Sequence, residues 1–218
     1  MNKLITAQEA IGKIRDGDRI MIGGFGLRGC PDELVDELVR SGRKELTIIS
    51  NDLGSPNQGL GRLLTNGQVK GLIGSYYNWN SEAVEAYNNG KISVTLVPQG
   101  TLAESMRAAG VGIPAYYTPT SVGTLLEGVK EVREFSGRKY VLEEAIHTDV
   151  ALIRASRADT LGNLVYSKTA RNFNPLMAIA APLTIVEVDE VVEAGELDAE
   201  TVVTPHIYVN AIVKRSSK

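Results

Sequence analysis

Residues 16–31 read Asp-Gly-Asp-Arg-Ile-Met-Ile-Gly-Gly-Phe-Gly-Leu-Arg-Gly-Cys-Pro, and this stretch decides the fold of the chain. Its apolar part, Ile20–Ile22, predicts a buried strand that runs into the glycine-rich turn 23–30. Behind the turn, residues 32–40 carry apolar side chains at helical spacing, and Pro31 suits the first helical position because its missing N–H costs nothing there. Strand, glycine turn and helix in this order predict a site where backbone N–H groups at the positive end of a helix dipole meet a phosphate, a carboxylate or an oxyanion.

The rest of the chain alternates between strand patterns and helix patterns. Thr6–Glu9 predicts a capping box that opens a helix through Ile14. Further strands are predicted at Leu46–Ser50, Val69–Ile73, Ile92–Val97, Val150–Ala155, Leu183–Val188 and Val209–Val213, and helices at Ser81–Asn88 and Leu102–Ala109. This order indicates an α/β fold, with a mostly parallel open sheet flanked by helices, and residues 1–218 are expected to form a single domain.

Three connecting segments carry turn signals. Gly110–Gly123 is rich in Gly, Pro and Thr, and we expect it to form an ordered loop over a site. Residues 131–142 flank Ser136-Gly137-Arg138 and predict a hairpin. Asn174-Pro175 favours a turn.

Composition narrows the possible functions. The chain has 218 residues, a formal net charge of −3 and no basic run longer than a pair such as Lys214-Arg215, so nucleic acid is not an expected partner. No long apolar window or signal pattern occurs, so neither a membrane span nor export is expected. The single cysteine, Cys30, suits a reducing cytosol, and a cytoplasmic location is expected. His147 and His206 are too isolated to predict a metal site.

The glycine turn is also compatible with a dinucleotide-binding motif. Gly24–Gly29 is a literal G-x-G-x-x-G, and Asp52 follows the next strand at about the distance expected for an acid that binds a ribose. Taken alone, these residues predict an NAD-type oxidoreductase domain. A set of catalytic acids and bases for hydride transfer is not evident elsewhere in the sequence.

The wider pattern is more specific than this hexapeptide. Asp16-Gly17, Ile20–Ile22, Gly23-Gly24-Phe25, Gly29 and Pro31 together resemble the glycine motif of the α subunits of family I CoA-transferases. Further blocks similar to the same kind of subunit follow in order at 48–52 (Ile-Ile-Ser-Asn-Asp), 97–104 (Val-Pro-Gln-Gly-Thr-Leu-Ala-Glu), 112–120, 158–166 and 170–177. The resemblance therefore covers nearly the whole chain and is greatest to the α subunits of acetate, acetoacetate and butyrate CoA-transferases.

The resemblance implies that this chain is one of the two kinds of subunit that together form an enzyme. Such enzymes move CoA between short-chain acyl-CoA or acetoacetyl-CoA and short-chain carboxylates such as acetate and butyrate, through a glutamyl-CoA intermediate. The nucleophilic glutamate belongs to a Glu-Asn-Gly motif of the β subunit, and this chain contains no such string. The expected assembly is α2β2, with coenzyme A as a substrate and no permanently bound cofactor or metal. A CoA-binding scaffold without activity is the remaining alternative.

The resemblance also implies which residues face the substrate, although none is expected to be catalytic in this chain. Residues of the turn that would bind CoA or the acyl oxygen are Gly24, Phe25, Gly26, Leu27, Arg28, Gly29 and Cys30. Arg28 could neutralise a phosphate or a carboxylate, whereas Cys30 is expected to be a small buried filler. Asn51 and Gln99 each follow a predicted strand, at the end where open α/β sheets bind ligands, and their amides can donate to an oxyanion.

Two other segments are expected to make structural contacts. Residues 171–174, Arg-Asn-Phe-Asn, are predicted to be structural or interfacial. Residues 76–79, Tyr-Tyr-Asn-Trp, are a candidate contact for the partner subunit because aromatic residues are enriched in such interfaces, and a core cluster is an equal alternative.

Overall fold

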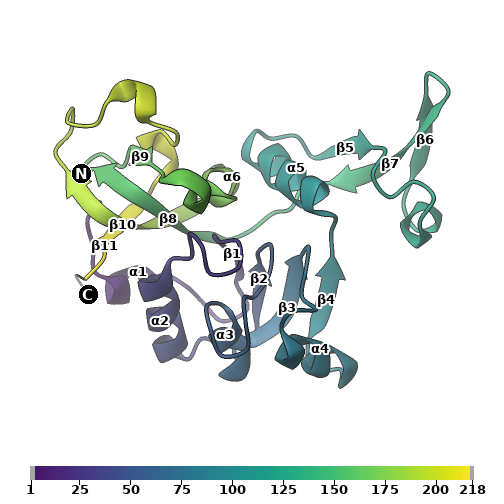
Figure 1. Cartoon of the computed structure of the whole chain (residues 1–218), viewed down its shortest axis with the longest axis horizontal. Coiled ribbons are helices and arrows are strands. Elements are labelled where there is room, and N and C mark those ends of the chain that lie inside the picture. The colour runs from purple at the N-terminus through teal and green to yellow at the C-terminus, as the bar shows by residue number, and fades with distance from the viewer. Residues whose placement is uncertain (1–2, 217–218) are drawn as a thin grey trace.

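A seven-stranded parallel sheet forms the centre of the chain, whose residues 3–216 are described by the computed structural model. The strand order is β4-β3-β2-β1-β8-β10-β11, and β9 pairs with β8 antiparallel (Figure 1). The strands are β1 (Arg19–Ile22), β2 (Leu46–Ile49), β3 (Val69–Gly74), β4 (Ser93–Leu96), β8 (Val150–Asp159), β9 (Leu164–Val165), β10 (Leu183–Val192) and β11 (Ala211–Lys214). The predicted α/β fold with a mostly parallel sheet is confirmed.

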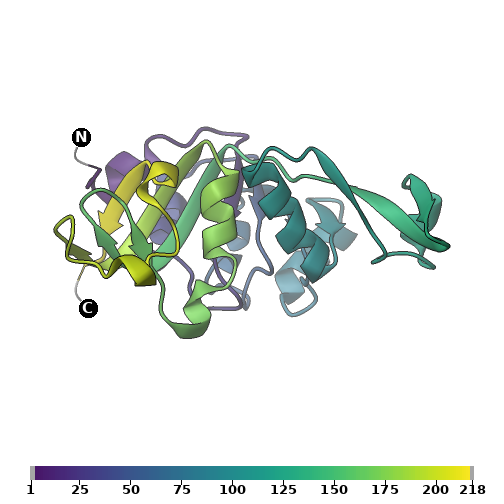
Figure 2. The ribbon, with the colours of Figure 1, turned by 90° about the horizontal axis from the view of Figure 1, so that it is seen from above.

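Helices cover both faces of this sheet (Figure 2). One face carries α1 (Ala7–Ile11), α2 (Asp32–Ser41), α3 (Gly61–Thr65) and α4 (Ser81–Asn88), and the other carries α5 (Gln99–Gly110) and α6 (Asn174–Ala180) side by side. Strand β1 shows why two layers form: Ile20 and Ile22 enter one core and Met21, pointing the opposite way, enters the other. Within residues 3–216, no helix combines the length and apolar character needed to cross a membrane.

A small antiparallel sheet projects from this body as an arm (Figures 1 and 2). It consists of β5 (Ala115–Thr118), β7 (Arg138–Glu144) and β6 (Val132–Phe135), and the short 3-10 helix η1 (Leu125–Gly128) lies between β5 and β6 in the chain. The ring of Phe135 makes edge contacts with Tyr117 and Tyr140. The predicted hairpin at 131–142 is confirmed.

The expectation of a loop over the site at 110–123 is wrong. The segment contains β5, whose backbone pairs with β7, so that it leaves the main sheet with the arm. Tyr116 and Tyr117 are residue types that favour strands, and pairing satisfies backbone groups that a loop would leave to solvent.

Other sequence predictions need smaller corrections. The capping box of Thr6 and Glu9 is present, but α1 ends at Ile11 instead of Ile14. Strand β4 is largely exposed and not buried as its apolar pattern predicts, because it is the edge strand of the sheet. Asn174-Pro175 begins helix α6 and does not form a separate turn, since a proline in the first helical turn needs no N–H partner.

Three 3-10 helices complete the described secondary structure. They are η2 (Lys168–Arg171), η3 (Ala199–Thr201) and η4 (His206–Tyr208). The first of them packs against β8, next to the glycine-rich turn.

Candidate active site

A cavity of about 820 Å³ lies at the carboxyl ends of β1 to β4. Because these strands are parallel, the loops that follow them meet at one edge of the sheet. The glycine loop (residues 23–30) follows β1, and the other walls come from the segments after β2, β3 and β4. The lining residues are Phe25, Gly26, Leu27, Asn51, Asp52, Gly54, Ser55, Ser75, Tyr76, Trp79 and Gln99.

One wall of the cavity is a chain of hydrogen bonds. Gln99 Nε2 donates to Asn51 Oδ1 at 2.8 Å, and Asn51 Nδ2 donates to Asp52 Oδ2 at 2.7 Å. The Asp52 carboxylate also accepts the N–H of Gly26 at 2.9 Å and that of Gly54 at 2.8 Å. Asn51 is buried and Gln99 is exposed, so the chain leads from the protein interior to an amide that can turn toward a ligand. The structure thus brings Asn51 and Gln99, which are 48 positions apart, into direct contact.

The cavity is also lined by exposed apolar side chains. Trp79 is 74% exposed, and Phe25, Leu27 and Tyr76 are each about half exposed. Tyr77 differs from its neighbours because it is buried and its hydroxyl donates to the carbonyl of Ser50 at 3.4 Å, while burial raises its pKa above the ordinary range. The aromatic segment predicted at 76–79 therefore splits into a core residue and two cavity residues. The sequence did not indicate that Tyr76 and Trp79 border the same cavity as the glycine loop.

The glycine loop itself is a tight turn. The N–H groups of Phe25 and Arg28 each donate to the carbonyl of the other, at 3.0 and 3.1 Å, and Gly26 between them has a positive φ of 57°. Within the described chain, the N–H groups of Gly24, Leu27, Gly29 and Cys30 have no hydrogen-bond partner. Among these four residues, Leu27 is exposed and lines the cavity, so its amide is the backbone donor that this turn can offer to a ligand there.

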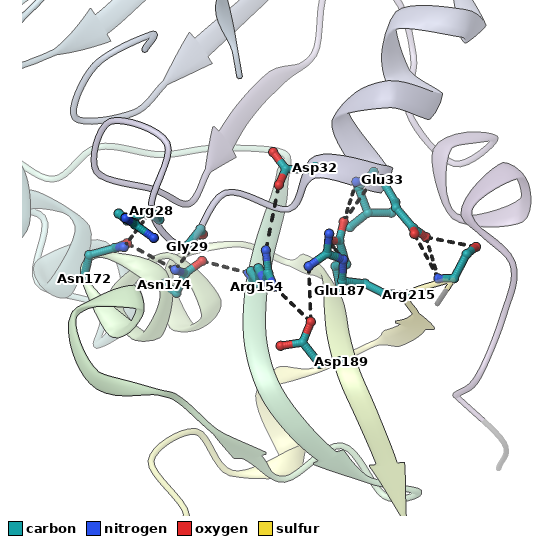
Figure 3. Close-up of polar contacts among 12 residues, drawn as sticks. Arg28, Gly29, Asp32, Glu33, Arg154, Asn172, Asn174, Glu187, Asp189 and Arg215 are labelled. Atoms are coloured by element: carbon teal, nitrogen blue, oxygen red, sulfur yellow. Dashed lines mark hydrogen bonds and ion pairs between the residues drawn. The ribbon is translucent and has the colours of Figure 1, made fainter. Parts of the chain in front are cut away.

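The side chains of two asparagines donate hydrogen bonds to the backbone of the glycine loop (Figure 3). Asn172 Nδ2 donates to the carbonyl of Arg28 at 2.9 Å, and Asn174 Nδ2 donates to that of Gly29 at 3.1 Å. Asn174 also accepts the backbone N–H of Arg154 in β8 at 2.8 Å. The side chains of Asn172 and Asn174 therefore connect the loop to the central sheet, which is the structural role expected for residues 171–174.

The prediction of a ligand at the N-terminus of helix α2 is wrong. A carboxylate of the chain itself occupies this position: Glu187 Oε2 from β10 accepts the N–H groups of Glu33 at 2.8 Å and Leu34 at 3.1 Å (Figure 3). Pro31 is the N-cap and not the first helical residue. The helix dipole thus stabilises an internal anion, and only the loop before the helix is left for a ligand.

Glu187 is fully buried, and burial raises the pKa of its carboxyl from 4.5 to about 7. Its backbone hydrogen bond with Leu34 and the charge of Arg215, whose Nε lies 3.1 Å from Oε1, oppose this shift. The group can consequently change its protonation state near neutral pH.

Glu187→Gln is expected to alter how stability depends on pH. Between about pH 4.5 and pH 7 the native protein holds more protons than the unfolded chain, so the free energy of unfolding falls as pH rises, by at most about 1.4 kcal/mol per pH unit. Glutamine does not titrate, yet its amide oxygen can still accept from both helix amides. Urea unfolding of both proteins across this pH range checks the prediction, and identical pH dependence would contradict it.

The remaining predicted residues lie outside the cavity. Gly24 and Gly29 are buried in the loop, and Cys30 is core: burial, followed by the charge of Asp32, raises the pKa of its thiol well above the ordinary value. Arg28 borders a second, smaller cavity. No cluster of potential metal ligands occurs in residues 3–216.

The fold and this site define a class of protein: residues 4–215 match the coenzyme A transferase family, and the chain belongs to that family. It is 52% identical over 215 residues to the A subunit of the succinyl-CoA:3-ketoacid coenzyme A transferase of Helicobacter pylori J99, with the match covering 98% of this chain and 93% of the relative. It is 50% identical over 206 residues to the A subunit of the 3-oxoadipate CoA-transferase of Pseudomonas putida, with coverages of 94% and 89%. Identity to the alpha subunit of the acetate CoA-transferase of Escherichia coli K12 is 46% over 211 residues, with coverages of 97% and 96%.

A solved structure shares the fold. An acyl-CoA transferase from Escherichia coli O157:H7, in a thioester complex with CoA, superimposes with a TM-score of 0.89 at 22% identity, covering 98% of this chain and 47% of that one. The family match and the similar subunits confirm the prediction of a CoA-transferase. The dinucleotide-binding alternative is wrong, because Asp52, its supposed ribose ligand, uses both carboxylate oxygens to hold Gly26 and Gly54.

Proposed function

We propose that this chain is the α subunit of a CoA-transferase that moves CoA between short-chain acyl-CoA or acetoacetyl-CoA and short-chain carboxylates such as acetate and butyrate. A β subunit completes the site and supplies the nucleophilic glutamate, in an α2β2 assembly. Relatives named for succinyl-CoA:3-ketoacid, 3-oxoadipate and acetate transfer support a carboxylate acceptor. The subunit designations of these relatives support a second chain.

The observation that carries the proposal is a cavity with donors but no free nucleophilic carboxylate. Among its described lining residues, Asp52 is the sole carboxylate, and both of its oxygens accept hydrogen bonds from the glycine loop or its neighbours. The backbone N–H of Leu27 and the side-chain amide of Gln99 are available to stabilise negative charge on oxygen. Ser75 adds a buried hydroxyl that has no hydrogen-bond partner among residues 3–216. The lack of a free carboxylate among the described lining residues supports a nucleophile supplied by a second chain.

The proposed chemistry proceeds in balanced steps. A glutamate oxygen of the β subunit attacks the thioester carbonyl, the carbon–sulfur bond breaks, and CoA leaves as a thiolate, so that a mixed anhydride of the acyl group and the glutamate remains. The thiolate attacks the glutamyl carbonyl, which releases the first carboxylic acid as its carboxylate and leaves a glutamyl-CoA thioester. The acceptor carboxylate then reverses both steps. Each addition places negative charge on an oxygen, which donors of the glycine loop and Gln99 would stabilise.

Co-expression with a candidate β chain that carries a Glu-Asn-Gly motif tests the proposal. Transfer of CoA from acetoacetyl-CoA to acetate is expected only when both chains are present. Without acceptor, the β chain is expected to gain the mass of one CoA less one water, and a variant with glutamine in place of the motif glutamate to gain nothing. Full activity of this chain alone would refute the proposal, and CoA binding without transfer with any β chain would favour the scaffold alternative.

A further inference from the structure

A second cavity of about 270 Å³ lies on the other side of the glycine loop. It lies at the end of β1 and beside β8, where the order of the strands reverses. From β1 the chain adds β2, β3 and β4 on one side, whereas β8, β10 and β11 lie on the other side of β1. Such switch points are where open α/β sheets bind ligands. The lining residues are Leu27, Arg28, Gly29, Arg154, Ala155, Ser156, Tyr166, Ser167, Ala170 and Asp189.

Strand lengths explain why there is space at this point. β1 ends at Ile22, which pairs with Leu152 of β8, whereas β8 continues to Asp159. Residues 154–156 of β8 therefore have no β1 partner, and the glycine loop and the segment before α6 border the gap.

The cavity carries an excess of positive charge. Two arginines, Arg28 and Arg154, and one aspartate, Asp189, are among its lining residues. Arg154 pairs with Asp189 at 2.9 Å, and Asp189 also pairs with Arg215 at 3.2 Å, so this carboxylate is shared between two arginines (Figure 3). In contrast, the guanidinium of Arg28 has no hydrogen bond or ion pair within residues 3–216. One cation at the cavity is therefore left for a ligand.

The two cavities share a wall. Leu27 lines both of them, and Arg28, the next residue, lines the smaller one. A ligand that extended from the larger cavity past this side chain would place a charged group beside Arg28. The guanidinium fork matches the geometry of carboxylate and phosphate, which it can bind through two parallel hydrogen bonds.

We propose that the smaller cavity is an anion subsite in which Arg28 binds a carboxylate or phosphate group carried by the ligand of the larger cavity. The assignment of that ligand rests on the proposed function. Two sources share this chemistry: a second carboxylate on the acyl group, and a phosphate of CoA. In either case Arg28 is a specificity residue and not a catalytic residue, because it lies across Leu27 from the amides of the reacting site.

The first experiment measures anion binding without transfer. Succinate and inorganic pyrophosphate are titrated separately onto the full chain while the midpoint of thermal unfolding is followed. At least one anion is expected to raise the midpoint of the wild type, Arg28→Gln to abolish that rise, and Arg28→Lys to keep part of it. Arg15→Gln, at an exposed arginine that does not line the cavity, serves as the matched control. No rise in the wild type, or an equal rise in Arg28→Gln, overturns the proposal.

The second experiment identifies the source of the anion in the two-chain enzyme. If the group is a CoA phosphate, Arg28→Gln is expected to raise KM about tenfold for an acyl-CoA. The dephospho form, which lacks only the 3′-phosphate, shows the same rise if Arg28 binds the diphosphate and no rise if it binds the 3′-phosphate. If the group is a carboxylate, KM rises for succinate and not for acetate, and kcat changes little in both cases. Unchanged KM for all four substrates overturns the proposal. Should the two-chain enzyme show no transfer, the proposed function fails, and the first experiment still decides the anion subsite.

Discussion

Gly23→Ala is expected to lower the free energy of unfolding by about 3 kcal/mol or more, a large part of the total stability of an ordinary domain. A Cβ at this position would overlap Oδ1 of Asn174. That side chain cannot move aside, because it is fully buried, accepts the N–H of Arg154 and donates to the carbonyl of Gly29. The backbone of Gly23 does not have a positive φ, so the effect is one of space alone.

Chemical denaturation and the yield of folded protein measure this effect. Gly128→Ala is the matched control, because a Cβ there meets no atom of the described part of the chain within 4 Å and the backbone φ is not positive. Asn174→Ala removes the overlapping atom along with its hydrogen bonds, so the double variant with Gly23→Ala is expected to lose less stability than the sum of the two single variants. Additive losses, or a Gly23→Ala protein as stable as the control, would contradict the steric argument.

The sequence predicted those features that depend on neighbouring residues. Helix α4 begins and ends where its pattern indicated, at Ser81 and Asn88, and β1 to β3 match their apolar runs to within one residue at each end. The glycine pattern located the loop, because turns and close approaches impose local requirements that only glycine meets. Asn51 and Gln99 were placed at strand ends, and parallel strands bring such ends together.

What the sequence could not predict depends on contacts between distant segments. Glu187 reaches helix α2 from 154 and 153 positions away, and no local pattern marks it as the group that caps that helix. The reason for glycine at position 23 is likewise a side chain far along the chain, Asn174. A helix N-terminus looks free in a sequence until the fold shows which internal anion occupies it.

Gln99→Ala is expected to reduce kcat of the two-chain enzyme about a hundredfold, the usual effect of removing one donor from an oxyanion site. Gln99 is exposed, and the hydrogen bond of its side chain runs to Asn51, so the substitution should leave the free energy of unfolding nearly unchanged. Gln8→Ala, the same change at an exposed position of α1, controls for the substitution itself.

Asn51→Ala is expected to affect both kcat and the free energy of unfolding, whereas Gln99→Ala is expected to affect kcat alone. Asn51 is buried and connects Gln99 to Asp52, which in turn holds the N–H of Gly26. Its loss is expected to lower kcat at least as much as Gln99→Ala and, in addition, to destabilise the fold by about 1–3 kcal/mol, because buried polar partners lose their hydrogen bonds. Steady-state kinetics and urea unfolding of the three variants separate the two effects. If the kcat of Gln99→Ala equals that of Gln8→Ala, the Gln99 amide does not stabilise the oxyanion. The free backbone amides of the glycine loop are then the remaining candidates for that role.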